Sequence, residues 1–301
     1  MAFGQVPHTD IVVFELVWND LGRLELHNPL RITDRAAYDN QPSFHPDGSG
    51  LLYTSMQGQQ TDIYYYNLTD SATRALTKTV ESEYSPKVMG DGQFFSVVRV
   101  ELPDSAQRLW RFPLVDISGE SGKPKLIMDQ VDGIGYYSWI NQGQLALFIL
   151  PGREGRQTLQ VCHANKQRTW IVAAGIGRCI QSIPGEDAVS FTVDTGSDRD
   201  QLKRYDHKNR AVTDLGQALP ESRDYVWTPD GKILMGAGER LYFLDPKGEG
   251  GGDGRWHLGF DLAAYLNGMG FSSFDRMAIS PDGTRLAVVM TRVADAAEAE
   301  Q

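Results

Sequence analysis

The sequence predicts an all-β fold, a six-bladed β-propeller with four antiparallel strands in each blade. Three observations predict it. A Pro-Asp-Gly turn between two apolar strands recurs along the chain. Its exact and degenerate copies are spaced at a nearly constant interval. The last copy lies too close to the C-terminus to complete a blade, while two strands without a hairpin of their own stand at the N-terminus.

The repeated turn has a clear chemical basis at residues 46–48, where Pro presets φ, Asp can bond the backbone two residues on, and Gly accepts positive φ. Two strands joined by so short a turn form a hairpin. The six turn positions are Asp47, Asp91, Gln142, Glu186, Asp230 and Asp282, separated by 44, 51, 44, 44 and 52 residues. A period in the forties with four strands per unit is typical of propeller blades.

Each hairpin is followed by a third strand rich in Tyr, Leu or Val and by a short fourth strand. In the first unit these strands are expected at 62–67 and 74–77. The next four units place them at 108–114 and 125–128, 158–163 and 168–172, 201–205 and 211–215, and 240–245 and 255–258. The apolar spacing across 260–268 predicts one or two helical turns before the final hairpin.

The last blade is expected to contain both ends of the chain. Segment 10–16 has the pattern of a third strand and 30–33 that of a fourth, so residues 11–16 should pair with 285–290. Such closure removes two exposed strand edges. The predicted blades cover 37–79, 82–130, 133–175, 177–218, 222–259, and 273–293 together with 10–34, in a single domain of residues 1–301 whose last residues, 294–301, form a disordered tail.

Composition excludes several classes of function. The chain has 301 residues, 29 Lys and Arg against 39 Asp and Glu, and a net charge of −10. Nucleic acids and anionic membranes both attract basic surfaces, so neither is an expected partner. No apolar run is long enough for membrane insertion. The N-terminus has no signal-peptide pattern, so the protein is either cytoplasmic or begins after a removed signal.

The two cysteines, Cys162 and Cys179, are too few for a disulfide framework, and their spacing fits no zinc motif. We expect two buried thiols, with a disulfide between them as the alternative.

The repeat itself resembles a known family. Residues 39–48 read Asp-Asn-Gln-Pro-Ser-Phe-His-Pro-Asp-Gly, and an apolar strand and Thr-Asp-Ile-Tyr-Tyr-Tyr-Asn-Leu at 61–68 follow. This pattern resembles the TolB-like β-propeller repeat, as do residues 224–231 and 275–283, while the other units match by spacing. The resemblance implies a six-bladed bacterial propeller, often periplasmic, that docks a protein partner and whose channel can hold a calcium ion. It also implies similarity to propellers that gate peptidases, although the Gly-x-Ser-x-Gly motif of their hydrolase domain is absent.

Candidate functional residues stand just before each first strand, where a propeller presents side chains to one mouth of its channel. Aligning the hairpins selects Asp39, Glu83, Tyr136, Arg178, Arg223, Asp224, Asp275 and Arg276 as candidates for ligand or partner binding. The four carboxylates among them could converge on a hard cation such as calcium, which takes six to eight oxygen ligands. The alternatives are contact with a peptide or partner, and solvated loop residues that cap their own turns.

Two functions follow from this pattern. The leading hypothesis is a non-catalytic, monomeric, periplasmic scaffold that grips a protein or peptide at the channel mouth and loop face. The alternative is a metal-dependent lyase or hydrolase acting on a saccharide or lactone in the central channel. No Ser/His/Asp constellation is readable in the sequence.

Overall fold

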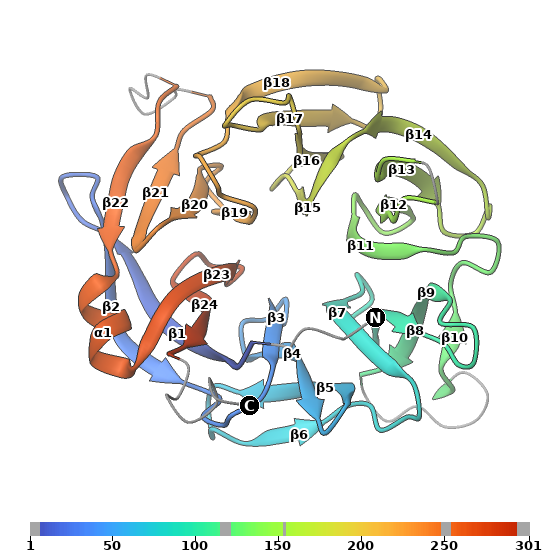
Figure 1. The fold of residues 1–301 in the computed structure, drawn as a ribbon, viewed down its shortest axis with the longest axis horizontal. Coiled ribbons are helices and arrows are strands. Elements are labelled where there is room, and N and C mark those ends of the chain that lie inside the picture. The colour runs from blue at the N-terminus through green and yellow to red at the C-terminus, as the bar shows by residue number, and fades with distance from the viewer. Residues whose placement is uncertain (1–6, 115–121, 153–154, 248–253, 294–301) are drawn as a thin grey trace, which may run out of the picture.

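The structure, a computed structural model, describes residues 7–114, 122–152, 155–247 and 254–293. Six four-stranded antiparallel sheets stand around a common axis, each with its first strand innermost and its last strand at the rim (Figure 1). This arrangement confirms the predicted six-bladed propeller. The predicted tail at 294–301 lies outside the described residues.

The first three blades follow chain order. Blade 1 contains β3 (Asp39–Phe44), β4 (Gly50–Gln57), β5 (Gln60–Asn67) and β6 (Thr73–Ala75). Blade 2 contains β7 (Ser82–Val88), β8 (Phe94–Val100), β9 (Gln107–Pro113) and β10 (Lys125–Leu126). Blade 3 contains β11 (Ile134–Trp139), β12 (Gln144–Ile149), β13 (Thr158–His163) and β14 (Thr169–Ala174).

Blades 4 and 5 repeat the plan, and blade 6 joins the two chain ends. Blade 4 contains β15 (Ile176–Ser182), β16 (Ala188–Val193), β17 (Gln201–Asp206) and β18 (Ala211–Gln217). Blade 5 contains β19 (Tyr225–Trp227), β20 (Ile233–Ala237), β21 (Arg240–Leu244) and β22 (His257–Asp261). Helix α1 (Ala263–Met269) follows, and blade 6 contains β23 (Phe271–Ile279), β24 (Arg285–Arg292), β1 (Thr9–Trp18) and β2 (Leu24–Arg31).

The ring is closed by β1, which pairs antiparallel with β24 as predicted. Ile11 lies opposite Val289, and Glu15 lies opposite Arg285. Beside this seam Asp10, which is fully buried, accepts hydrogen bonds from Arg31 at 2.5 Å and from Arg292 at 2.8 Å. The ends of the chain are therefore joined by both a strand ladder and a buried ion pair.

Two elements near the chain ends differ from the sequence prediction. β2 begins at Leu24, whereas the fourth strand was placed at 30–33. The sequence prediction started the strand after Pro29, because proline interrupts most strands. Proline is tolerated in edge strands, and β2 is the outer edge of its blade. The predicted helical turns are present as α1, but β22 continues to Asp261, so the helix begins later than residue 260.

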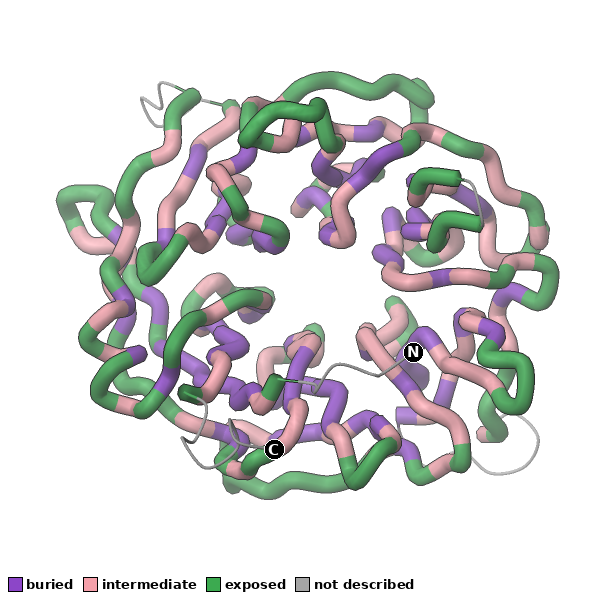
Figure 2. Tube along the Cα trace, in the orientation of Figure 1, coloured by how far each residue is buried: buried purple, intermediate pink, exposed green. Residues whose placement is uncertain are grey.

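The core is divided among the blade interfaces, with one apolar cluster between each pair of neighbouring blades. Along β1, Val12 and Phe14 face blade 5 whereas Ile11 and Val13 face blade 1, because strand side chains alternate between the two faces of a sheet. The second strands are accordingly buried, and the outermost strands, such as β18, are largely exposed (Figure 2). Cys162 and Cys179 are free buried thiols within this core.

Helix content is small, and among the described residues no helix has the length and apolar character needed to cross a bilayer.

The same hydrogen-bond arrangement, a buried serine that accepts from two aromatic side chains, spans two of the blade interfaces; we call it the clasp. Buried Ser190 on β16 accepts from the Tyr225 hydroxyl at 2.9 Å and from Trp227 Nε1 at 2.8 Å, both on the first strand of the next blade. Ser96 on β8 accepts in the same way from Tyr137 at 2.8 Å and Trp139 at 2.9 Å. The aromatic residues between these blades thus also carry specific polar contacts.

Substituting alanine for Ser190 is expected to lower the free energy of unfolding by about 2 kcal/mol, because two buried donors lose their acceptor together. Ser96→Ala should show a smaller loss, because the Tyr137 hydroxyl can also donate to the Ser85 carbonyl at 3.0 Å, whereas alanine at the exposed Ser272 should show none. Urea denaturation of the three variants measures this. Equal stability of all three would show that the clasp contributes nothing.

Candidate functional site

Irregular pairing in the innermost strands positions the side chains at the channel mouth. The register between first and second strands shifts across residues 40–43, 84–87, 134–136, 176–180 and 274–277. Such β-bulges leave residues outside the ladder and re-aim their side chains. Arg178, Asp275 and Arg276 all lie within these irregular stretches, and Asp224 directly precedes the short strand β19. The same local feature therefore turns residues of several blades toward one place.

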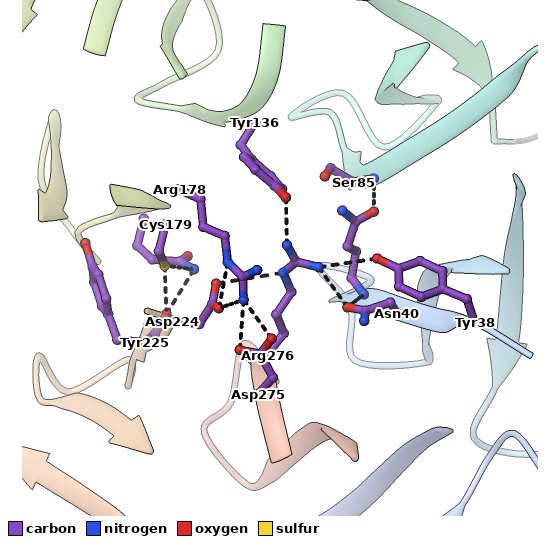
Figure 3. A network of polar contacts seen from close by, with 12 residues as sticks. Tyr38, Asn40, Ser85, Tyr136, Arg178, Cys179, Asp224, Tyr225, Asp275 and Arg276 are labelled. Atoms are coloured by element: carbon purple, nitrogen blue, oxygen red, sulfur yellow. Dashed lines mark hydrogen bonds and ion pairs between the residues drawn. The ribbon is translucent and has the colours of Figure 1, made fainter. Parts of the chain in front are cut away.

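Four of these residues form a charged network between blades 4, 5 and 6 (Figure 3). Arg178 Nε donates to Asp224 Oδ2 at 3.0 Å, and its Nη2 donates to both oxygens of Asp275, at 2.9 and 2.7 Å. Arg276 Nε lies 3.8 Å from Asp224 Oδ1. Two cations and two carboxylates thus neutralise each other, and we call these four residues the mouth network.

Arg276 extends the mouth network across the axis to blades 1 and 3. Its Nη2 donates to the Tyr136 hydroxyl at 2.8 Å, and its guanidinium carbon lies 5.2 Å from the Tyr136 ring centroid. Its Nη1 donates to Asn40 Oδ1 at 3.0 Å and to the Tyr38 hydroxyl at 3.4 Å (Figure 3). A single arginine therefore ties together inner strands that are far apart in sequence.

Burial sets the electrostatics of the mouth network. The Asp224 side chain is 9% exposed, and burial raises the pKa of its carboxyl to about 6, against the lowering effect of Arg178 and Arg276. Burial disfavours the charge of Arg178 too, but Asp224 and Asp275 outweigh it and hold the pKa of Arg178 above its usual range. Asp275 remains 46% exposed, so one carboxylate of the network faces solvent.

The other predicted residues lie elsewhere. Asp39 is fully buried, and Arg35 holds its carboxylate through two bonds of 2.9 and 2.6 Å. Glu83 is also fully buried, with Oε1 accepting from Thr79 at 2.6 Å. Neither residue lines the channel cavity. Arg223 is exposed beside the mouth network.

Sequence reasoning missed Tyr38, Asn40 and Lys87. Tyr38 and Asn40 flank a residue that was selected, but neither carries a charge that would draw attention to it. Lys87 lies after a bulge, at the far end of β7 from Glu83, and its side chain lines the channel cavity, where burial lowers its pKa. A search for polar residues within three positions after the start of each first strand would have found Asn40.

The channel itself is narrow. Its cavity measures about 90 Å³ and is lined by residues of all six inner strands, among them Lys87, Tyr136 and Arg276. This volume holds only about three waters, whereas pockets for small-molecule ligands are typically about 300–1,000 Å³. The four predicted metal-binding carboxylates do not meet there. Within the described part of the chain no group of three or more His, Cys, Asp or Glu side chains could hold a metal ion, and the calcium ion stays a prediction.

A larger hollow lies beside the mouth network, between blades 5 and 6. It measures about 380 Å³, and Arg178, Asp224 and Asp275 form its inner wall. Phe274 and Gly236 lie at its base, where a Cβ on Gly236 would come within 2.5 Å of the Phe274 ring. The remaining lining residues are Pro220, Glu221, Ser222, Arg223, Ala237, Gly238, Ser273 and Thr291. We call this hollow the mouth groove.

Comparison with solved structures shows which known propellers this architecture is similar to. A putative TolB from Agrobacterium tumefaciens superposes with a TM-score of 0.66, over 96% of this chain and 100% of that one, at 14% identity. The chain has the TolB-like propeller fold. TolB from Acinetobacter baumannii gives a TM-score of 0.57 at 12% identity, over 96% of this chain, which spans 65% of that protein's length.

The same fold also occurs in enzymes. An oligogalacturonate lyase from Vibrio parahaemolyticus matches with a TM-score of 0.53 at 12% identity, over 96% of this chain and 99% of that one. No family model matches the sequence, and no curated protein matches it. At these identities the likeness is one of fold, and function has to be argued from the residues of this chain.

Proposed function

We propose that the protein is a non-catalytic binding scaffold that grips an extended peptide segment of a partner protein in the mouth groove. The observation that carries the proposal is the groove itself, which lies against the charged mouth network and is several times larger than the channel cavity. The TolB-like fold is compatible with this role, because rigid blades present loops of variable chemistry. We further propose that the chain acts as a monomeric single domain in the periplasm.

The backbone of blade 5 favours an extended ligand. β19 contains only three residues, and its pairing with β20 ends at Met235. In the part of the chain that the structure describes, Gly236 and Ala237 of β20 therefore have a ladder partner on β21 but none on the channel side. An open strand edge is a template for an added strand.

The side chains of the groove supply the other requirements of peptide recognition. Phe274 provides an apolar contact, while Glu221, Arg223 and Asp275 present both signs of charge in the lining. A partner side chain of either charge can exchange ion pairs with Arg178 or Asp275, which are partly exposed. Backbone pairing then supplies affinity, and these side chains supply specificity.

The enzyme alternative requires a metal and a saccharide in the channel. It predicts that calcium or manganese raises the melting temperature, because an ion that binds the folded state in preference to the unfolded state stabilises the protein. A shift with calcium alone fits either function, because the resemblance also implies a calcium ion in the channel of the scaffold. No shift with either ion would count against the metal-dependent enzyme.

The scaffold is tested by selecting binders from a displayed library of random peptides on the purified protein. We expect a recurring sequence pattern, and at least tenfold weaker binding of the selected peptides to Arg223→Glu and to Ser273→Trp, which fills the groove. Leu258→Trp adds the same bulk on the exposed outer strand β22, and Arg23→Glu makes the same charge change at the β1–β2 turn; both should bind normally. The proposal fails if no pattern is enriched, or if all four variants bind alike.

A further inference from the structure

A second pocket lies between blades 3 and 4, at the opposite end of the strands from the mouth network. Its lining includes residues at the start of β12 and in the β17–β18 turn. Arg178 and Asp224 lie at the beginnings of first strands, and because consecutive strands are antiparallel, the start of a second strand lies at the other end of the blade. Its volume is about 250 Å³. The lining residues are Gln144, His163, Lys166, Arg168, Trp170, His207 and Arg210, and we call it the rim pocket.

The rim pocket is basic in a protein of net charge −10. None of its lining residues is acidic, and Lys166, Arg168 and Arg210 are all exposed. No ion pair with a carboxylate joins these three cations in the described structure, whereas the neighbouring Arg204 is held by Glu186 and Asp206. Asp187 and Asp206 are near enough to act on His207, but clustered cations that form no ion pairs still create a local positive potential that favours an anion.

The pocket also contains two buried polar atoms without a hydrogen-bond partner, Gln144 Oε1 and His207 Nδ1. Leaving such a buried polar atom unsatisfied destabilises the protein, so a ligand that supplies the missing partner is favoured. A carboxamide oxygen can only accept, so Gln144 requires a donor such as a hydroxyl group. A cationic donor would be repelled by the neighbouring Lys166, Arg168 and Arg210, so a neutral hydroxyl group of a bound anion is a suitable donor for Gln144.

Aromatic contacts hold the pocket in shape. Trp170 Nε1 donates to the Tyr205 hydroxyl at 3.3 Å, and the Trp170 ring lies 6.0 Å from that of His207. The Arg210 guanidinium carbon lies 5.0 Å from the Trp170 ring centroid. The arginine and the imidazole are therefore pre-positioned, which lowers the entropy lost when a ligand binds.

We propose that the rim pocket binds a small anion that carries hydroxyl groups, a sugar phosphate or a sugar acid. The phosphate or carboxylate lies among Lys166, Arg168 and Arg210, where arginine can bind it through two parallel bonds. A hydroxyl group donates to Gln144 Oε1. The volume is just below the usual range for ligand pockets and accommodates one monosaccharide rather than a chain.

The test is isothermal titration calorimetry of the full chain with glucose 6-phosphate, galacturonate, glucose and inorganic phosphate. We expect saturable binding of glucose 6-phosphate or galacturonate, at least tenfold tighter than glucose, and the tighter of the two identifies the anionic group. Lys166→Ala with Arg168→Ala, and separately Arg210→Ala, should weaken that binding at least tenfold. Arg23→Ala removes an exposed arginine from the β1–β2 turn and should leave it unchanged.

Gln144→Met separates the two parts of the proposal. It should weaken the sugar anion severalfold and leave inorganic sulfate, titrated in the same way, unaffected, because sulfate carries no hydroxyl donor at neutral pH whereas the sugar does. The proposal is overturned if neither sugar anion binds saturably, or if the substitutions at Lys166, Arg168 and Arg210 leave the binding unchanged. Circular dichroism of each variant verifies that loss of binding is not loss of fold.

Discussion

Arg178→Met is expected to lower the free energy of unfolding at pH 7.5 by about 2–4 kcal/mol. Breaking a fully buried ion pair costs about 3–5 kcal/mol, and the value is smaller here because Asp275 is half exposed. Methionine replaces the apolar stem of arginine but not its guanidinium, so it leaves Asp224 and Asp275 facing each other. Arg276, at 3.8 Å from Asp224, acts on both carboxylates but compensates them only in part. Urea denaturation at fixed temperature measures the loss.

The same variant should respond to pH in a defined direction. Loss of Arg178 raises the pKa of Asp224 further, so the folded state of the variant takes up a proton more readily than the unfolded state. Its stability deficit should therefore shrink as the pH falls from 7.5 to 5. Arg240→Met, in an exposed pair with Asp261, serves as the matched control and should lose nothing beyond measurement error. A deficit independent of pH would mean that Arg178 acts through packing alone.

Architecture was predictable from the sequence because its signals are local and repeated. The turn at Asp47 specifies a hairpin by its own chemistry, and the constant interval between such turns implies equivalent blades. The closure of the ring was predictable from the same repeat, because the last hairpin lacked a third strand and residues 11–16 could supply it. Pairing of Ile11 with Val289 shows that the register was fixed by the apolar alternation of both strands.

The site was only partly predictable, because aligned repeats give the depth of a residue along the axis but not the direction of its side chain. Asp224 and Asp39 were selected on the same grounds. Asp224 meets Arg178 of the preceding blade, whereas Asp39 is bonded by Arg35, four residues earlier in its own loop. A β-bulge changes the facing of every later residue in its strand, and nothing in the local sequence marks where the bulge falls.

The rim pocket shows how the repeat brings together residues that look unrelated. His163 and His207 are one blade period apart, 44 residues, and so occupy equivalent positions on neighbouring blades. No metal-ligand spacing or motif links them. Cations follow both of them, Lys166 and Arg168 in the β13–β14 turn and Arg210 in the β17–β18 turn, and all three line the rim pocket. The proposed site is therefore built largely from turns, whose chemistry can vary while the strands stay equivalent.

The free energy of unfolding is expected to fall as the pH rises from 6 to 8, because the buried carboxyl group of Glu83 then loses its proton. Its side chain is fully buried, its Oε2 has no hydrogen-bond partner, and burial raises its pKa to about 7, despite Thr79 and Arg99. A carboxyl group with a raised folded-state pKa binds its proton more tightly in the folded than in the unfolded protein. Its stabilising contribution is complete below pH 4.5 and is lost as the pH passes 7, a change of about 3 kcal/mol.

Glu83→Gln tests this expectation, because glutamine stays neutral at every pH. The free energy of unfolding, measured by urea denaturation from pH 5 to pH 8, should fall less steeply for the variant, and at pH 8 the variant should be the more stable protein. Subtracting the two curves removes the contributions of the histidines and of Asp224, which titrates at lower pH. Glu239→Gln, at an exposed position, should reproduce the original curve. Parallel curves for Glu83→Gln and the unchanged protein would show that Glu83 is ionised throughout, held so by Arg99.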